Sequence, residues 1–471
     1  MESLATCITL LTLLGIITHT NVSALPPRHM EHFIRTVEHV EGWNPLLKPL
    51  AVVRALRQVG GLEDCFIQHF LGAVNEEIPT LTSEASDFIR ATVRHKVTDR
   101  VEEGVVLTVD GTTVALAPLL LGIEAGLLGG AESPISGLYP LTLAKTLGLS
   151  FLHSHDPSLP EILGPDGCWD SMTSPQVFTL SGERSLVTDA LINGGMDGIV
   201  LGVELSACTQ HPLTLSGLLK QYYHHQLQGE GLDFAPNIIS PRRRKKFGDL
   251  ANPTLLQEQV LRSLALYQRL MGDTGVEEGA GPEAAVKEGV QLFVNRYMEC
   301  PAIIQRCQWE AKPYRGTPTE LVLPLSFMYI HHTFEPSQPC LSFQQCSANM
   351  RAMQRFHQDD RGWDDIGYSF VVGSDGYIYE GRGWKWRGAH TKGHNSRGYG
   401  ISFIGDYTAN LPARHALELV RDQLAVCAVG GGQMTANFTM HGHRQLVNTS
   451  CPGDALYSEI QGWEHFREVQ P

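Results

Sequence analysis

The sequence has no excess of positive charge. Its 36 lysine and arginine residues are outnumbered by 50 aspartate and glutamate residues, which gives a formal net charge of -14. A protein that binds nucleic acid through its phosphates needs a basic surface, so the overall charge argues against a nucleic-acid partner. The hydrophobic fraction of 42% and the charged fraction of 18% are those of a globular chain, and 471 residues suffice for two or three domains.

The sequence also has no uninterrupted apolar run of the length that crosses a bilayer, about 20 residues. The run from Leu4 to Ile17 is shorter, and the small residues that follow it fit cleavage after Ala24. We therefore predict a secretory signal peptide over residues 1–24 and a secreted, extracellular protein. Glu2 stands where basic residues are usual, and a buried helix is the alternative.

Residues 25–295 are predicted to form a mostly helical region. An Asp110-Gly111 pair indicates a hairpin of residues 105–109 and 112–116, because this pair favours the turn that matches strand twist. The apolar residues 114–128 include a proline and a glutamate, so a buried core segment is favoured over a membrane span, and we expect no membrane association. A strong helical pattern runs from Thr254 to Met271.

A basic run at residues 242–246 contrasts with the acidic chain. We expect a solvated loop there. A protease-sensitive or polyanion-binding loop is the alternative.

The cysteine count is informative in a secreted chain. Of ten cysteines, Cys7 would leave with the signal peptide. An odd set of nine in an oxidising compartment indicates that one thiol serves a purpose other than a disulfide. In the mature chain, two sequons, at Asn437 and Asn448, are candidate glycosylation sites.

From residue 296 to residue 471 the pattern changes to strands that alternate with helices. Residues 327–330 are predicted to be a buried strand that ends at His331. Further elements are expected at residues 343–357 (helix), 366–379 (hairpin), 400–405 (strand) and 412–428 (helix). The fold class is therefore α/β, with a central mixed sheet flanked by helices in a C-terminal domain at 296–471.

Three side chains in this domain have the chemistry of an open zinc site. His331 ends a strand, and His443 and Cys451 stand eight residues apart before Pro452-Gly453. Catalytic zinc takes three protein ligands, typically imidazole or thiolate, and keeps one position open. Zinc carries two positive charges and the thiolate one negative charge, so such a site has a net charge of +1. This charge favours bound hydroxide over bound water near neutral pH. From spacing alone, a buried histidine or a disulfide cysteine is an equal alternative.

Seven segments of the C-terminal domain carry a resemblance to a known family. They are residues 300–309, 330–333, 361–370, 379–384, 388–391, 442–445 and 450–453. In this order they resemble the peptidoglycan recognition proteins, which share their fold with phage-type zinc amidases. The large N-terminal region is similar to that of the long secreted vertebrate form of this family.

The resemblance implies a zinc amidase that cuts the lactyl–L-alanine amide of bacterial peptidoglycan in innate immunity. It puts the zinc ligands at His331, His443 and Cys451, and it selects His331 over His332. It puts the catalytic tyrosine at Tyr368, which would donate to the developing oxyanion or position the water. Family members that bind without cutting typically carry serine at the Cys451 position.

The resemblance also implies a substrate groove. Gly362 and Trp363 accompany a preference for diaminopimelate-type stems, with Arg382 as a partner for the extra carboxylate. Core packing is the alternative for Trp363. The substrate-binding residues implied are Thr333, His357, Gly362, Trp363, Arg382, His390 and Thr449.

Two disulfides follow from the resemblance, Cys340–Cys346 and Cys300–Cys427. With Cys451 as a zinc ligand, an even set of four cysteines remains whose pairing stays open: Cys65, Cys168, Cys208 and Cys307.

Two other functions remain open at this stage. The chain could be a recognition protein that binds peptidoglycan in the same groove without cutting it. Alternatively, the N-terminal region could be the main functional part, as an interaction or membrane-active domain. The oligomeric state stays open.

Overall fold

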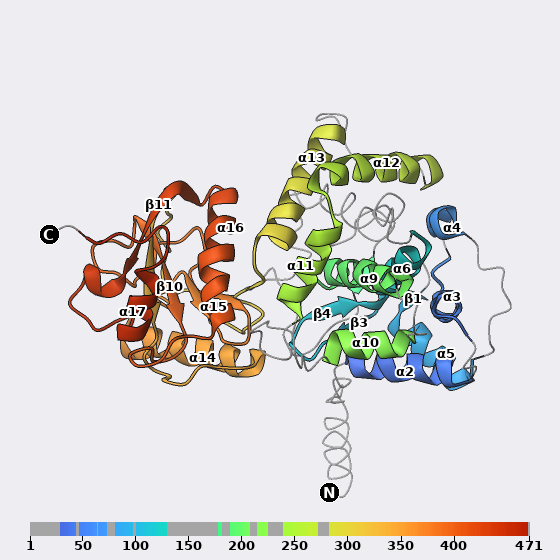
Figure 1. Ribbon diagram of the computed structural model, residues 1–471, viewed down its shortest axis with the longest axis horizontal. Coiled ribbons are helices and arrows are strands. Elements are labelled where there is room, and N and C mark those ends of the chain that lie inside the picture. The colour runs from blue at the N-terminus through green and yellow to red at the C-terminus, as the bar shows by residue number, and fades with distance from the viewer. Residues whose placement is uncertain are drawn as a thin grey trace, which may run out of the picture.

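The computed structural model describes residues 29–43, 47–63, 65–72, 81–97, 100–129, 178–180, 189–207, 214–224, 239–271 and 282–469. The predicted signal peptide, Cys168 and Cys208 lie outside these residues. Figure 1 shows two lobes, with the helices of the N-terminal region in one and the C-terminal sheet in the other. None of the helices that the structure describes is long and apolar enough to cross a membrane.

The described part of the N-terminal region is mainly helical, as predicted. Its helices are α2 (Met30–Trp43), α3 (Pro49–Val59), α4 (Cys65–Leu71), α5 (Ser83–Thr92), α6 (Leu116–Gly129), α9 (Asp189–Ala207), α10 (Leu215–His224), α11 (Ser240–Leu250), α12 (Pro253–Met271) and α13 (Pro282–Phe293). A small sheet has the strand order β1 (Arg94–Val97), β2 (Arg100–Glu103) and β5 (Phe178–Leu180). The helix predicted to run to Met271 is confirmed as α12.

Helices α6 and α9 pack closely in the core of this region. Gly122 of α6 lies so near Gly198 of α9 that a Cβ atom on Gly122 would meet its Cα at 2.8 Å. Gly126 and Gly202 make a second contact of this kind, at 2.7 Å. Most of α6 is buried. The expectation that the apolar stretch forms a buried core segment is therefore confirmed.

The basic run is neither a solvated nor a polyanion-binding loop, and that expectation was wrong. Residues 242–246 lie within α11, where four of the five basic side chains have partners inside the protein and Lys245 is exposed. Arg243 is buried and binds Asp197 through two hydrogen bonds of 2.7 and 2.8 Å. Arg244 donates to the carbonyl of Cys300 at 3.0 Å. A buried guanidinium needs such a paired carboxylate, since an unpaired charge is costly in the interior.

The predicted hairpin consists of β3 (Val105–Leu107) and β4 (Thr113–Ala115), and its turn connects the two lobes. Gly111 has a φ of +84°, which glycine adopts without strain. The Asp110 carboxylate is buried and accepts hydrogen bonds from the Thr108 and Thr112 hydroxyls, each at 2.6 Å. Its other oxygen accepts from the Tyr377 hydroxyl of the C-terminal domain at 3.0 Å.

The C-terminal domain is built on a six-stranded mixed sheet, which confirms the predicted fold class. The order is β11 (Met434–Gly442), β7 (Leu325–His332), β10 (Gly398–Phe403), β8 (Phe370–Val372), β9 (Ile378–Glu380) and β6 (Ile303–Ile304). The pairs β11–β7, β7–β10, β10–β8 and β9–β6 are parallel, whereas β8 and β9 form the predicted antiparallel hairpin.

Helices cover the two faces of this sheet. The predicted helix at 343–357 is α14 (Phe343–Arg355), which continues as a π-helical turn, Phe356–Asp360. The predicted helix at 412–428 comprises α15 (Arg414–Glu418), a π-helical segment (Leu419–Leu424) and α16 (Ala425–Gly430). Met328 and Ile330 of β7 pack in one core with α15, α16 and α17 (Asp454–Ile460). Because strand side chains alternate, Tyr329 and His331 face the other side.

The structure bonds Cys340 to Cys346 and Cys300 to Cys427, the two pairs that the family resemblance implies. Cys307 is also disulfide-bonded. Among the described cysteines of the C-terminal domain, Cys451 is the one outside a disulfide.

The buried bond between Asp110 and Tyr377 generates a prediction about stability. Tyr377→Phe removes a donor from a carboxylate that both lobes bury. We expect the free energy of unfolding to fall by about 1–3 kcal/mol, the range for a hydrogen bond to a charged group. Chemical denaturation measures it. Tyr457→Phe is the control, because the described residues give the Tyr457 hydroxyl no hydrogen-bond partner. Equal stability of the two variants would contradict the bond.

Candidate metal centre

His331 and His443 come together because their strands run parallel. In the register of β7 and β11, Ile330 is paired with Gly442. The next residue after this pair is therefore His331 on β7 and His443 just after β11. Their imidazole rings lie 4.3 Å apart, centroid to centroid. Carboxyl ends of parallel strands meet at one sheet edge, which is a common place for functional side chains.

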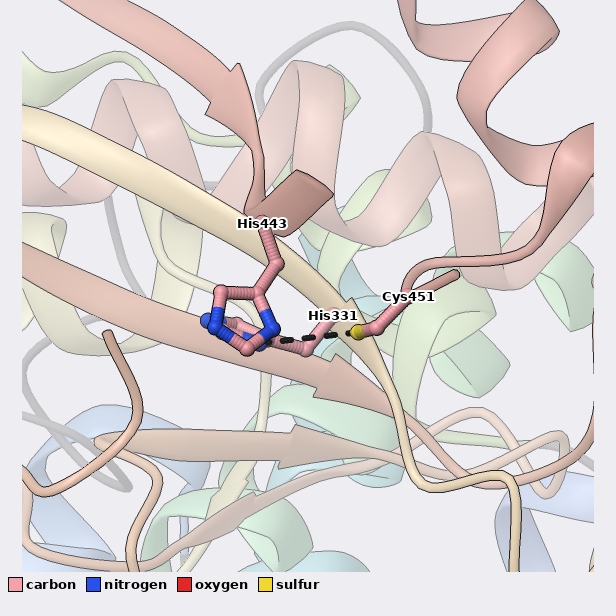
Figure 2. Close-up of side chains that lie close together, drawn as sticks. All are labelled: His331, His443 and Cys451. Carbon is pink, nitrogen blue, oxygen red and sulfur yellow. Dashed lines mark hydrogen bonds between the residues drawn. The ribbon is translucent and has the colours of Figure 1, made fainter. Parts of the chain in front are cut away.

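Cys451 reaches the same place from the loop after His443. Its Sγ lies 3.7 Å from Nδ1 of His331. Figure 2 marks this contact with a dashed line. One ligand atom from each of His331, His443 and Cys451 lies within 4.8 Å of the other two. Two ligands bound to a tetrahedral zinc at about 2.0–2.3 Å lie roughly 3.3–3.7 Å apart. The cluster therefore has the donor types that zinc takes. The 3.7 Å contact of Cys451 with His331 matches the spacing of two zinc ligands, while the full 4.8 Å span would have to contract by about 1 Å around an ion.

The electrostatics of the cluster also fit a metal. Burial lowers the pKa of His331 well below its usual value and lowers the pKa of His443 to about 4. Both imidazoles are therefore neutral near pH 7, as metal ligands must be. Nδ1 of His443 is buried and has no hydrogen-bond partner among the described residues, which leaves its lone pair available to an ion.

The Cys451 thiol is protonated when no cation is bound. Burial raises its pKa to about 12, although a 3.5 Å hydrogen bond from the backbone amide of His332 lowers it. Binding of a divalent cation would therefore release a proton from this thiol.

His332 points away from the cluster. Its Nδ1 accepts a hydrogen bond from the backbone amide of Tyr407 at 3.1 Å and lies 3.7 Å from the Asp406 carboxylate. Adjacent strand residues face opposite sides, so only one of the two histidines can reach the ligand set.

The ring of Tyr368 lies near two histidines, His331 of the cluster and His357. Its ring is 5.3 Å from the His331 ring and 5.9 Å from the His357 ring. Burial, followed by the charge of Cys451, raises the pKa of the Tyr368 hydroxyl above its usual value. This hydroxyl keeps its proton near neutral pH and can act as a hydrogen-bond donor.

His357 and Trp363 form a stacked pair beside Tyr368. Their rings lie 4.7 Å apart with an interplanar angle of 17°. Nδ1 of His357 accepts from the amide of Gly367 at 3.2 Å, and burial lowers the pKa of His357 to about 4. Gly362 precedes the tryptophan with a φ of +67°, which favours glycine there.

Arg382 is buried and its donors point at the protein. Nε donates to the carbonyl of Ile366 at 2.7 Å, and Nη1 donates to the carbonyl of Arg387 at 2.8 Å and to the Tyr314 hydroxyl at 3.2 Å. In this structure Arg382 therefore holds the loops that follow Trp363.

The other residues predicted to bind substrate are Thr333, His390 and Thr449. Thr333 follows β7 and accepts from the amide of Gly405 at 2.9 Å. The His390 ring lies 5.3 Å from the His331 ring. Thr449 accepts from the amide of Cys451 at 3.2 Å, which fixes the loop that carries the thiol. Asn437 and Asn448, the two candidate glycosylation sites, are both exposed.

Thr391 was not predicted from the sequence as a site residue, and the structure places it against a metal-site histidine. Its Oγ1 lies 3.3 Å from Nε2 of His331, although the two residues are 60 positions apart. The sequence offers no signal for this contact beyond the position of Thr391 after His390, because sheet packing alone brings it to β7.

Comparisons with known proteins show which proteins this chain is similar to. A family model described as N-acetylmuramoyl-L-alanine amidase matches residues 322–454. A curated N-acetylmuramoyl-L-alanine amidase of Mus musculus is 42% identical over 447 residues, which is 83% of this chain and 83% of that protein. Peptidoglycan-recognition protein 1 of Holotrichia diomphalia is 42% identical over 172 residues, 36% of this chain and 83% of that protein. The structure of Drosophila PGRP-LB is 38% identical, covers 36% of this chain and 97% of that chain, and has a TM-score of 0.35.

The similarity to the mouse amidase extends over most of both chains and so includes much of the N-terminal region. The family model, in turn, spans all three residues of the metal cluster and Tyr368. The extent of the similarity to the mouse protein shows that the chain belongs to the N-acetylmuramoyl-L-alanine amidase family.

Proposed function

We propose that this protein is a secreted, zinc-dependent N-acetylmuramoyl-L-alanine amidase of innate immunity. It hydrolyses the amide between the lactyl group and L-alanine in bacterial peptidoglycan. The observation that carries the proposal is the cluster of His331, His443 and Cys451 beside the Tyr368 hydroxyl. We assign the activity to residues 296–471, which follow a signal peptide at 1–24 and the N-terminal region at 25–295.

His331, His443 and Cys451 would hold the zinc ion. When bound, zinc supplies Lewis-acid polarisation of the amide carbonyl and activates the attacking water. The two histidines contribute neutral lone pairs because burial keeps their pKa values low. Cys451 contributes a thiolate, which distinguishes this chain from relatives with serine there.

Tyr368 acts on the oxygen of the scissile amide. Its hydroxyl is protonated because burial raises its pKa, so it can donate a hydrogen bond as negative charge develops on that oxygen. The rings of His331 and His357 hold the Tyr368 ring from two sides, which orients the donor before substrate binds.

The stacked His357 and Trp363 form the wall for the stem peptide, and Thr333, His390 and Thr449 line the groove near the metal. Gly362 and Trp363 support a preference for diaminopimelate-type stems. Arg382 would serve this preference by fixing the loop carbonyls of Ile366 and Arg387 rather than by a direct bond to the carboxylate, because its donors are taken up by the protein.

Loss of the thiol should remove both the metal and the activity. Cys451→Ser is expected to abolish cleavage and to weaken zinc binding by more than the roughly 10- to 100-fold that loss of an outer-shell partner costs. Zinc content and chelator competition measure this. His332→Gln is the matched control, because His332 faces away and should leave zinc content intact. A serine variant that cuts as fast as the parent would refute the ligand set.

Zinc affinity should increase with pH. The Cys451 pKa of about 12 lies above the neutral range, so each zinc ion must displace one thiol proton, whereas the histidines are already deprotonated. The affinity should therefore rise about tenfold per unit between about pH 6 and pH 8. Titration calorimetry in buffers of different ionisation enthalpy counts the released proton. A pH-independent affinity would contradict the protonated thiol.

Tyr368→Phe should retain zinc and substrate binding but lose rate. Removal of one donor to a developing oxyanion costs about 10²–10³ in kcat. Mass spectrometry of digested muropeptides should show free stem peptide and intact glycan for the parent, with kcat rather than KM reduced in the variant. New reducing sugar ends, with peptide still attached, would identify a glycosidase instead. Binding without any release would identify a recognition protein.

A further inference from the structure

A buried threonine connects a metal-site histidine to a groove histidine. Thr391 is fully buried, with an exposed fraction of 0%. Its Oγ1 lies 3.3 Å from Nε2 of His331 and 3.0 Å from Nδ1 of His390. A hydroxyl can donate one hydrogen bond while it accepts another, so Thr391 can pair with both rings at once.

The position of Thr391 is fixed by its own loop. The side-chain oxygen of Asn395 accepts from the backbone amides of His390 and Thr391, at 2.9 and 2.7 Å. The His390 ring lies between glycines, since a Cβ atom on Gly400 would meet its Cγ at 2.2 Å and one on Gly388 would meet its Cδ2 at 2.3 Å. The close approach of these two glycines holds the His390 ring in its place beside Thr391.

The direction of the hydrogen bonds follows from the metal cluster. Nδ1 of His331 faces Cys451, so this nitrogen is the one that can ligate an ion, and Nε2 must carry the ring proton. Nε2 then donates to Thr391 Oγ1. The threonine proton remains for Nδ1 of His390, which must accept.

We propose that Thr391 is a positioning residue that fixes the tautomers of His331 and His390. It holds His331 with Nδ1 free for the metal and holds His390 with its proton on Nε2. The proposal rests on the metal site of the proposed function and assigns to Thr391 a role in metal affinity. Outer-shell partners of this kind set the ring orientation and the basicity of ligating histidines.

Thr391→Val tests the proposal, because valine keeps the shape and removes the hydroxyl. In the full-length protein we expect zinc affinity, measured by chelator competition, to fall about 10- to 100-fold. Thr391→Ser, which restores the hydroxyl, should recover most of that loss. Zinc affinity of the valine variant equal to the parent's would overturn the proposal, and so would equal weakening in the serine variant.

Ring-nitrogen NMR shifts of ¹⁵N-histidine-labelled parent protein provide a readout that does not depend on the valine variant folding. In the zinc-loaded parent, His390 should carry its proton on Nε2. A proton on Nδ1 would overturn the tautomer assignment. If Cys451→Ser loses zinc while Thr391→Val does not, the proposed function stands and this inference fails. If neither variant loses zinc, the metal site itself is wrong.

Discussion

The parallel pairing of β7 with β11 is the constraint on which the site depends. The pairing of Ile330 with Gly442 brings His331 and His443 side by side at one sheet edge. A shift of one residue in this register would turn one histidine into the opposite core, because strand side chains alternate. The core beneath, with Met328, Ile330 and the helices α15 to α17, fixes the register and thereby the metal cluster.

Burial gives each group in the cluster its protonation state. It lowers the pKa of His331 and His443, and it raises the pKa of Tyr368 and Cys451. The same low-dielectric environment therefore yields two neutral imidazoles, one hydroxyl that keeps its proton, and one thiol that could bind a cation only by losing its proton. A cation at the cluster is the natural counter-charge for that thiolate.

The N-terminal region is joined to the C-terminal domain by buried polar contacts as well as by the chain. Asp110 of the N-terminal hairpin accepts from Tyr377 of the sheet, and Arg244 of α11 donates to the carbonyl of Cys300. Both groups come from segments whose sequence suggested only local roles, a turn and a solvated basic loop. Their partners are distant in sequence, so no local pattern could indicate them.

The sequence by itself determined most elements of the C-terminal domain and the chemical types at its site, but it did not locate β6, α17 or the strand β11 that leads to His443. Strand and helix periodicity located β7, α14 and the β8–β9 hairpin, and the order of the motifs indicated His331, His443, Cys451 and Tyr368 through a family resemblance. Spacing alone left a buried histidine or a disulfide cysteine equally open. Only the tertiary structure decided how the side chains point. The strand places His332 on the face opposite His331. Packing between elements brings Thr391 to His331 across 60 residues and directs the Arg382 donors onto loop carbonyls. Those contacts depend on packing between elements, which periodicity within one element does not encode.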